Sequence, residues 1–377
     1  MNSQAIPPVP GPAGAFERFR PAYRVLEDAV AARAFPGCAF GVLAHGNVVL
    51  QDAVGRFTYE ADAPAVTAET VFDVASLTKV AATTAMAMLL HQRGQIELET
   101  PLGNLLPGFL DGRGAESAAN QVTLRHLLAH NSGLPGYVEF FRTAATPDSL
   151  LRACLQLPLE AEPGARAEYS DPGFILLGKA LEAVSGEKLD SWVQREIFQT
   201  LGMAQTRFCP DRAVVGCLIP PTEEDTTFRH RRIQGEVQDE NAWVLGGVSG
   251  HAGLFSNIPD LLRFAGATLT ANRSIGGLSG TAVLFDPATI ELFAQRQPPA
   301  GSSCALGWDT PSEVSSAGKH FSKHSIGHLG YTGCTLWIDL EAEVAVVLLT
   351  NRTWPDCKNQ LIKAVRPAFH DAIREAL

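Results

Sequence analysis

The sequence predicts an α+β fold, an α/β sandwich in which an antiparallel sheet flanked by helices carries an inserted all-helical domain. Two patterns support this prediction. Strand-like runs occur near both ends of the chain, within 37–57 and 334–352, whereas the stretch between them has the spacing of helices separated by Pro and Gly loops. The order strands, helices, strands is typical of one sheet built from both ends of a chain.

These patterns also divide the chain into two expected domains. Residues 1–70 and 232–377 would form a discontinuous sheet domain, and residues 71–231 would form the inserted helical domain. We expect the active site in a cleft between the two, because ligand pockets occur preferentially where domains meet.

The N-terminal part is expected to contain a helix followed by a hairpin. Apolar residues recur at helical spacing in "AFERFRPAYRVLEDAVAARAF" (15–35). The runs "GCAFGVLA" (37–44) and "VVLQDAVGRF" (48–57) flank "HGN", so they are predicted to be two strands joined by a short turn.

The middle of the chain is predicted to be mainly helical, and strands are predicted again in the C-terminal part. Helices are predicted from Ser76 and over "TLRHLLAH", "PDSLLRACLQL", "PGFILLGKALEAVSG" and "LDSWVQREIFQTLGM". The β-rich runs "CTLWIDL" and "EVAVVLLTNR" are joined by a short acidic turn at Glu341 and Glu343. The closing segment 357–377 is predicted to be an amphipathic helix with a kink at Pro367.

Composition limits the class of protein. The chain of 377 residues is long enough for a large core, and its 46% hydrophobic and 19% charged residues are typical of a globular protein. A net charge of −10 disfavours nucleic acid as a partner, because phosphate binding needs clustered Lys and Arg. No apolar run is long enough to span a bilayer, so no membrane partner is expected. The sequence does not indicate the oligomeric state.

Cysteine usage and the N-terminus predict a cytoplasmic protein. The seven cysteines are widely spread and include no C-x-x-C pair, which favours free thiols in a reducing compartment. The first twenty residues lack a basic segment followed by an apolar one, so no signal peptide is expected.

A Ser-x-x-Lys motif occurs three times, and only one copy opens an apolar helix. The copy at 185–188 lies past a helix end, and the copy at 316–319 lies in a polar loop. Ser76 and Lys79, in contrast, are followed by "VAATTAMAMLL", which suits a buried helix. Lys79 would then lie one turn after Ser76 on the same side of that helix.

This pair suggests nucleophilic catalysis. A serine hydroxyl needs an adjacent base before it can attack, and a lysine desolvated by apolar neighbours has a lowered pKa and can serve. Lys79 could instead hold a second base in its anionic form. The structural alternative is that Ser76 caps the helix and Lys79 extends to the surface.

Two further elements follow in the chain. Tyr169 and Asp171 lie in a loop just before a long apolar helix. His328, Gly330 and Tyr331 are expected at the start of a strand, where the missing side chain of Gly330 would let a substrate approach the backbone closely.

In this order, the three elements resemble the serine β-lactamase-like hydrolases, which include class C β-lactamases, DD-peptidases and β-lactamase-fold esterases. The resemblance covers nearly the whole chain, with the segments "QVTLRHLLAHNSGLPG", "EPGARAEYSDPGFILLGKALEAVSG", "LGGVSGHAGLFSNIPDLLRFA", "LGWDTPS" and "IGHLGYTGCTLWIDL". It implies a β-lactamase/transpeptidase-like fold and hydrolysis through an acyl-enzyme, with no metal or cofactor.

The resemblance also implies a role for each residue. Ser76 would be the nucleophile, Lys79 its activating partner and Tyr169 the general base, whose phenolate the lysine would favour. The backbone N–H groups of Ser76 and Tyr331 would form the oxyanion hole. Tyr169 would also activate the water that releases the acyl group.

Two departures from the family pattern bear on the substrate. Many members carry Asn at the position of Asp171, and an ionised Asp cannot donate to a substrate carbonyl. Asp171 could instead pair with Lys79 or select a substrate that donates. Many β-lactamases carry Lys at the position of His328, whereas a His is mostly neutral at pH 7 unless a carboxylate holds its proton. Both changes favour a less polar ester over a penicillin-type amide.

Other histidines do not predict a metal site. His126 and His130 lie four residues apart in "HLLAH", but the Glu of the zinc-protease motif is absent, so helix packing or loop anchoring is favoured. His320, His324 and His328 also recur every four residues, without an acidic residue or Cys at ligand spacing.

The sequence thus predicts a serine hydrolase, most simply a carboxylesterase acting on a small ester. One alternative is a β-lactamase or a D-amino-acid carboxypeptidase or amidase. The other is a non-catalytic member that binds a ligand, although such a protein has no need of Ser76, Lys79 and Tyr169 together.

Overall fold

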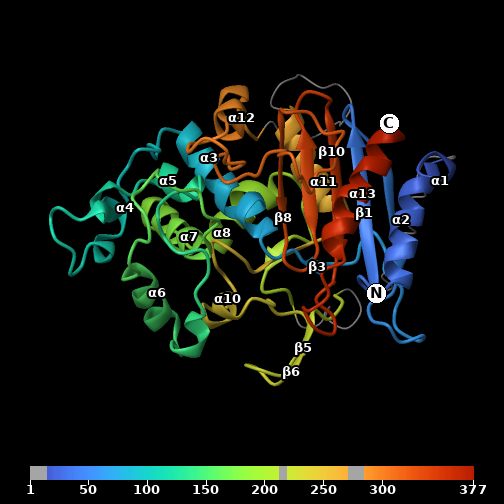
Figure 1. Cartoon of the computed structure of the whole chain (residues 1–377), viewed down its shortest axis with the longest axis horizontal. Helices are drawn as coiled ribbons and strands as arrows, with labels where there is room; N and C mark the ends of the chain where they lie inside the picture. Colours follow the sequence, from blue (N-terminus) through green and yellow to red (C-terminus); the bar gives the residue numbers. More distant parts are fainter. Residues whose placement is uncertain (1–14, 212–218, 271–283) are drawn as a thin grey trace, which may run out of the picture.

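A computed structural model describes residues 15–211, 219–270 and 284–377. It confirms the predicted α+β fold class. Figure 1 shows a sheet with its covering helices on one side of the molecule and a group of helices on the other. In these described ranges, no helix is both long and apolar enough to cross a membrane.

The main sheet has five antiparallel strands in the order β2-β1-β10-β9-β8. The strands are β1 (Gly37–Ala44), β2 (Asn47–Gly55), β8 (Ser325–Leu329), β9 (Thr335–Asp339) and β10 (Val344–Thr350). The predicted hairpin and the acidic turn between β9 and β10 are both confirmed. The central pair joins distant parts of the chain, since Cys38 of β1 lies opposite Thr350 of β10.

The helices of the described chain are mostly short. They are α1 (Ala15–Arg18), α2 (Arg20–Ala31), α3 (Ala85–Gln92), α4 (Leu102–Leu105), α5 (Leu124–Leu128), α6 (Pro147–Leu155), α7 (Asp171–Ser185), α8 (Leu189–Val193), α10 (Glu240–Val244), α11 (Ile258–Thr270), α12 (Pro287–Ala294) and α13 (Ile362–Glu375), with π-helical turns at Lys79–Thr84 and Gln194–Gln199 and 3₁₀ turns at Pro107–Phe109, Ala118–Gln121 and Phe140–Arg142. The segments that were predicted to be helical all contain helix, and Pro367 lies inside α13.

The two faces of the sheet are covered by different helices, because alternate residues of a strand point to opposite faces. In β10, Val346 and Leu348 belong to the apolar cluster that includes residues of α2 and α13. Val347 and Leu349 belong to the larger cluster, which includes residues of α11 and the Ser76 helix. Figure 1 shows α2 and α13 on the outer side of the sheet.

Short strands also occur in the stretch predicted to be helical. They are β3 (Phe72–Asp73), β4 (Arg207–Phe208), β5 (Glu223–Asp225) and β6 (Arg231–Ile233), and β3 and β4 both pair with β7 (Leu254–Ser256). Elements of two or three residues are too short to show a period in the sequence. The division into domains 1–70 with 232–377 and 71–231 stays a prediction.

The expected position of His328, Gly330 and Tyr331 was wrong. His328 lies near the end of β8, and Gly330 and Tyr331 lie in the turn that leads to β9. The segment "SIGHL" forms a strand of its own because it pairs with β9, where His328 lies opposite Leu336.

Candidate active site

Ser76 lies in the turn between β3 and the helix that begins at Leu77. The turn is closed by backbone hydrogen bonds from Leu77 to Val74 and from Lys79 to Ser76. Ala75, the residue before Ser76, has a φ of 48°, which is unusual for a residue with a side chain. The serine hydroxyl therefore sits at the start of a buried helix, on a sharply turned backbone.

The Lys79 side chain is fully buried and has three acceptors. Its Nζ lies 3.0 Å from Ser76 Oγ, 2.7 Å from Asp171 Oδ1 and 3.1 Å from the carbonyl oxygen of His251. An ammonium group has three hydrogens, so these contacts satisfy it completely. The alternative in which Lys79 extends to the surface is therefore wrong, whereas the pairing of Asp171 with Lys79 is confirmed.

The expectation of a lowered lysine pKa was wrong. Burial alone lowers the pKa of Lys79, but Asp171 and Tyr169 more than offset this effect, so the pKa is raised above its ordinary value. The reason is the carboxylate of Asp171 at 2.7 Å, which stabilises the charged form. Lys79 is consequently a cation in the resting protein.

Tyr169 lies beside this pair. Its ring centroid is 4.8 Å from Lys79 Nζ, and both Lys79 and Ser76 lower the pKa of its phenol. Desolvation within the cleft raises the pKa of Tyr169, and although Lys79 lowers it in part, the net shift is upward; the residue as a whole is 44% exposed, because one side of it faces the open cleft. The expected effect of Lys79 on the phenol is present, but desolvation outweighs it, so Tyr169 is neutral in the resting state.

His328 is buried beside Tyr169, with the two ring centroids 5.8 Å apart. Its Nδ1 donates to the carbonyl oxygen of Leu329 at 2.9 Å. Burial, with a further contribution from Lys79, lowers the pKa of His328 to about 3. The expectation that this histidine is neutral at pH 7 is therefore supported.

Gly330 packs against the backbone just before Ser76. A Cβ at Gly330 would lie 2.5 Å from the carbonyl oxygen of Val74, so close backbone packing excludes a side chain here. Arg352 and Arg366 hold this turn from behind: Nε of Arg352 donates to the Tyr331 carbonyl at 2.7 Å, and Nη2 of Arg366 donates to the Gly330 carbonyl at 2.6 Å.

The backbone N–H groups of Ser76 and Tyr331 are free to bind a ligand. Neither donates to an acceptor among the residues that the structure describes. Both residues line the same cleft. Two unpaired backbone donors in the same cleft as a serine hydroxyl are suited to stabilise a developing oxyanion.

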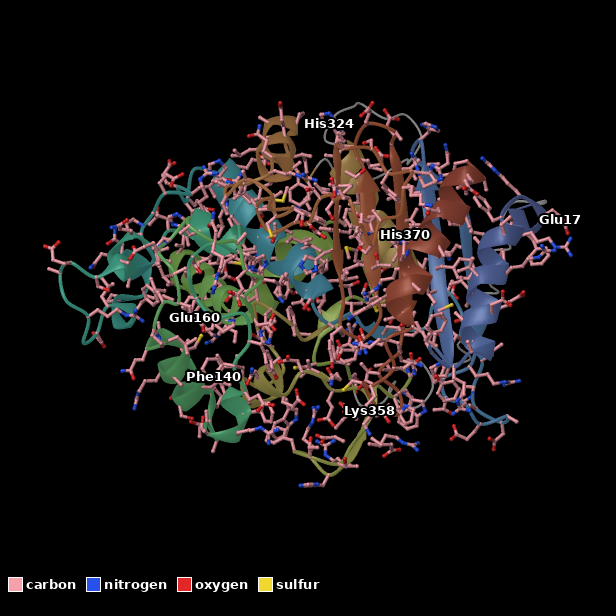
Figure 2. All side chains as sticks on the ribbon, viewed as in Figure 1. Glu17, Phe140, Glu160, His324, Lys358 and His370 are labelled. Carbon is pink, nitrogen blue, oxygen red and sulfur yellow. The ribbon has the colours of Figure 1, made fainter. Side chains whose placement is uncertain are left out.

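The cleft has a volume of about 1160 Å³. It is lined by Ser76, Tyr169, Asp171, His328, Gly330 and Tyr331, while Lys79 lies beneath its floor. The cleft extends from Phe141 on the helical side to Lys358 on the sheet side, and Figure 2 labels Phe140 and Lys358 at these places. The structure thus brings all seven predicted residues together.

Other predicted features have structural roles. His126 caps α5 together with Thr123, and Nδ1 of His130 accepts the backbone N–H of Ser170, which anchors the Tyr169 loop. These contacts support the interpretation as packing and anchoring residues. The lysines of the other two Ser-x-x-Lys motifs, Lys188 and Lys319, are exposed.

Neither metal binding nor disulfide formation is indicated in the described ranges. No group of three His, Cys, Asp or Glu side chains there could hold a metal ion. The six cysteines that are described carry free thiols, and Cys217 lies outside the described residues. The absence of a required cofactor stays a prediction.

Two groups that contact the site residues were not predicted from the sequence. The carbonyl of His251 accepts from Lys79, and a backbone carbonyl leaves no signal in a sequence. Asp73 accepts two backbone N–H groups beside the Ser76 turn. Its signal was a lone carboxylate in the apolar run "VFDVA", three residues before the serine.

Fold and geometry together define a serine hydrolase of the acyl-enzyme type. The chain belongs to the β-lactamase family, since the model of that family, described as "Beta-lactamase", matches residues 23–366.

Curated relatives are 30% identical to this chain over the aligned residues. A Salmonella typhimurium protein that carries the provisional name of a D-alanyl-D-alanine carboxypeptidase is 30% identical over 350 residues, which is 84% of this chain and 79% of the relative. An N-acetylmuramyl-L-alanine amidase of Bacillus subtilis is 30% identical over 365 residues, covering 89% of this chain and 81% of the relative.

Solved structures share the fold at lower identity. EstCE1, described as a hydrolase with promiscuous acyltransferase activity, is 23% identical, with a TM-score of 0.74 over 96% of this chain and 99% of that one. Simvastatin synthase (LovD) from Aspergillus terreus is 21% identical, with a TM-score of 0.71 over 95% and 98%.

Proposed function

We propose that this protein is a carboxylesterase for short-chain esters and that it acts through an acyl-enzyme on Ser76. The observation that carries the proposal is the hydroxyl of Ser76 at 3.0 Å from a buried lysine, in a cleft that also presents the free N–H groups of Ser76 and Tyr331. The nucleophile and the donors for the oxyanion therefore share one site.

The proton route follows from the charge states. Lys79 is protonated and Tyr169 is neutral at rest, so the pair must lose one proton before it can accept the proton of Ser76. Tyr169 then takes the serine proton as the hydroxyl attacks the ester carbonyl, and it returns the proton to the leaving alcohol. Water, activated in the same way, releases the acyl group.

The charge states of Asp171 and His328 support an ester as substrate. The carboxylate of Asp171 is engaged by Lys79 and can only accept hydrogen bonds. His328 is neutral and offers no fixed cation to a substrate carboxylate. The names of the curated relatives favour the second candidate, an amidase or carboxypeptidase acting on D-amino-acid substrates.

Paired substrates would test the proposal. We expect hydrolysis of p-nitrophenyl acetate and butyrate, slow or no turnover of nitrocefin and of a D-alanyl-D-alanine peptide, and labelling of Ser76 by a fluorophosphonate. The Ser76→Ala variant should lose turnover and labelling while its melting temperature stays within a few degrees of the wild type. If nitrocefin or the peptide were turned over faster than the esters, the amidase or carboxypeptidase candidate would be favoured over the esterase. A folded, active Ser76→Ala variant would refute the assignment of Ser76 as the nucleophile.

A further inference from the structure

A buried carboxylate lies three residues before the nucleophile. Asp73 is 2% exposed, and it makes no ion pair with any residue in the described part of the chain. Its Oδ1 accepts the backbone N–H of Ala75 at 2.8 Å, and its Oδ2 accepts that of Gln238 at 2.7 Å. Burial raises the pKa of Asp73 to about 6, so the group is still charged at neutral pH. Such a charge is costly unless its hydrogen bonds compensate for the lost water.

The first of these bonds acts on a strained residue. Ala75 has a φ of 48°, in the left-handed region that a residue with a Cβ rarely adopts. The carbonyl of Ala75 also accepts from Thr78 Oγ1 at 2.6 Å. Relaxation of Ala75 would rotate the peptide that leads into Ser76, and the Asp73 bond to its N–H opposes that relaxation.

The second bond, from the Gln238 N–H to Asp73, connects the Ser76 turn to the segment whose contacts hold Lys79. Gln238 precedes Asp239, whose Oδ1 accepts from His251 Nε2 at 2.9 Å. The carbonyl of His251 accepts from Lys79 Nζ at 3.1 Å. Asp73 therefore links the backbone of the serine to the segment that holds the lysine.

A third contact connects Asp73 to the turn after β8. The backbone carbonyl of Asp73 accepts from Thr332 Oγ1 at 2.7 Å, and Thr332 follows Tyr331 directly. The serine turn, the lysine support and the Tyr331 turn are thus joined at one residue, which itself does not line the cleft.

We propose that Asp73 is a positioning residue: it holds Ser76 at a fixed position relative to Lys79 and to the backbone N–H of Tyr331. This inference rests on the proposed function, since it concerns the reactivity of Ser76. Asp73 acts through the backbone and does not contact the substrate.

The main test is Asp73→Asn, which has the same shape but can accept at only one of the two positions. Loss of a hydrogen bond to a charged group corresponds to roughly a 10- to 100-fold change, so we expect kcat to fall by about this factor with KM changed less than about 3-fold. The rate of fluorophosphonate labelling of Ser76 should fall in parallel. Tyr23→Phe, which removes a hydrogen bond to Asp52 on the far side of the sheet, is the matched control and should leave both rates unchanged.

A double-mutant cycle tests the route through Ala75. Glycine adopts a positive φ readily, so Ala75→Gly should restore part of the labelling rate in the Asp73→Asn background, by about 3-fold or more. Independent effects of the two substitutions would overturn the proposal, as would unchanged labelling of Asp73→Asn while the wild type is labelled. Failure of the wild type to be labelled would instead refute the proposed function.

A second variant decides the matter if Asp73→Asn does not fold. Thr332→Val removes the hydroxyl that bonds the Asp73 carbonyl and keeps the shape of the side chain. We expect labelling of Ser76 to slow by about 3- to 10-fold, the effect of one neutral hydrogen bond. An unchanged rate of Ser76 labelling in a folded Thr332→Val variant would count against the proposal that Asp73 joins the serine turn to the Tyr331 turn.

Discussion

The buried pair of Lys79 and Asp171 predicts a stability effect that depends on pH. In Asp171→Asn, the ammonium of Lys79 would keep the acceptors Ser76 and His251 and lose its only counter-charge at ion-pair distance among the described residues. Breaking a buried pair from one side costs about 3–5 kcal/mol. Because the Asp171 side chain is 16% exposed and opens onto the cleft, we expect the lower end, about 3 kcal/mol near pH 7.

The sign of the pH dependence follows from linkage. In the wild type, the pKa of Lys79 is raised on folding, so the pair contributes its full stability below the unfolded pKa of about 10.4 and loses it above that pH. In Asp171→Asn, burial is no longer offset by a carboxylate, the folded pKa falls below the unfolded value, and the variant gains stability as pH rises. The difference between the two proteins should therefore shrink from pH 7 to pH 9.5.

Urea unfolding at pH 6, 7.5 and 9.5 measures this difference directly. Glu160→Gln is a suitable control, because Glu160 (labelled in Figure 2) forms a surface pair with Arg166 in which both side chains are 49% exposed. Such a pair contributes about 1 kcal/mol or less. A destabilisation of Asp171→Asn that is equally large at all three pH values would refute the view that Lys79 is held as a cation by Asp171.

Three further predictions follow from the same geometry. The value of kcat/KM for p-nitrophenyl butyrate should rise between pH 7 and 9, because the pKa values of Lys79 and Tyr169 are both raised; a profile governed by a group titrating near pH 6.5 would contradict this. Burial lowers the pKa of His370 to about 4, below its unfolded value near 6.5, so stability is lost as pH falls between these values. From this histidine alone we expect a loss of about 2 kcal/mol between pH 7 and 5, measured by urea unfolding, and a weaker dependence in His370→Gln, which cannot be charged. The double variant Asp171→Asn with His328→Lys should acylate faster with nitrocefin in stopped-flow measurements, and no gain would count against the explanation of specificity.

The fold could largely be predicted because its elements have clear periods. The strands β1, β2, β9 and β10 and the predicted helices each contain enough residues for alternation or helical spacing to show, whereas β3, with only Phe72 and Asp73, does not. The segment "SIGHL" was not predicted as the separate strand β8, because it is a strand through its pairing with β9, which is a tertiary contact.

The residues that meet in the candidate site could be predicted, as could the neutral state of His328, but the pKa shifts of Lys79 and Tyr169 could not. Residue types and order pointed to Ser76, Lys79 and Tyr169, and the structure brings their side chains together. The pKa of Lys79 depends on a carboxylate 92 positions further along the chain, at a distance that only the folded protein defines. The positive φ of Ala75 and the bonds of Asp73 are likewise properties of the folded backbone.

The pairing of β1 with β10 has a consequence for synthesis on the ribosome. The centre of the sheet forms between strands from opposite parts of the chain, so β1 must wait for almost all of the protein to be made before its neighbour exists. Until then the edge of the buried strand β1 that faces β10 is unpaired, and it can pair wrongly with another nascent polypeptide. Delayed closure of this kind makes the yield of folded protein sensitive to the rate of translation and to chaperones that shield the waiting edge.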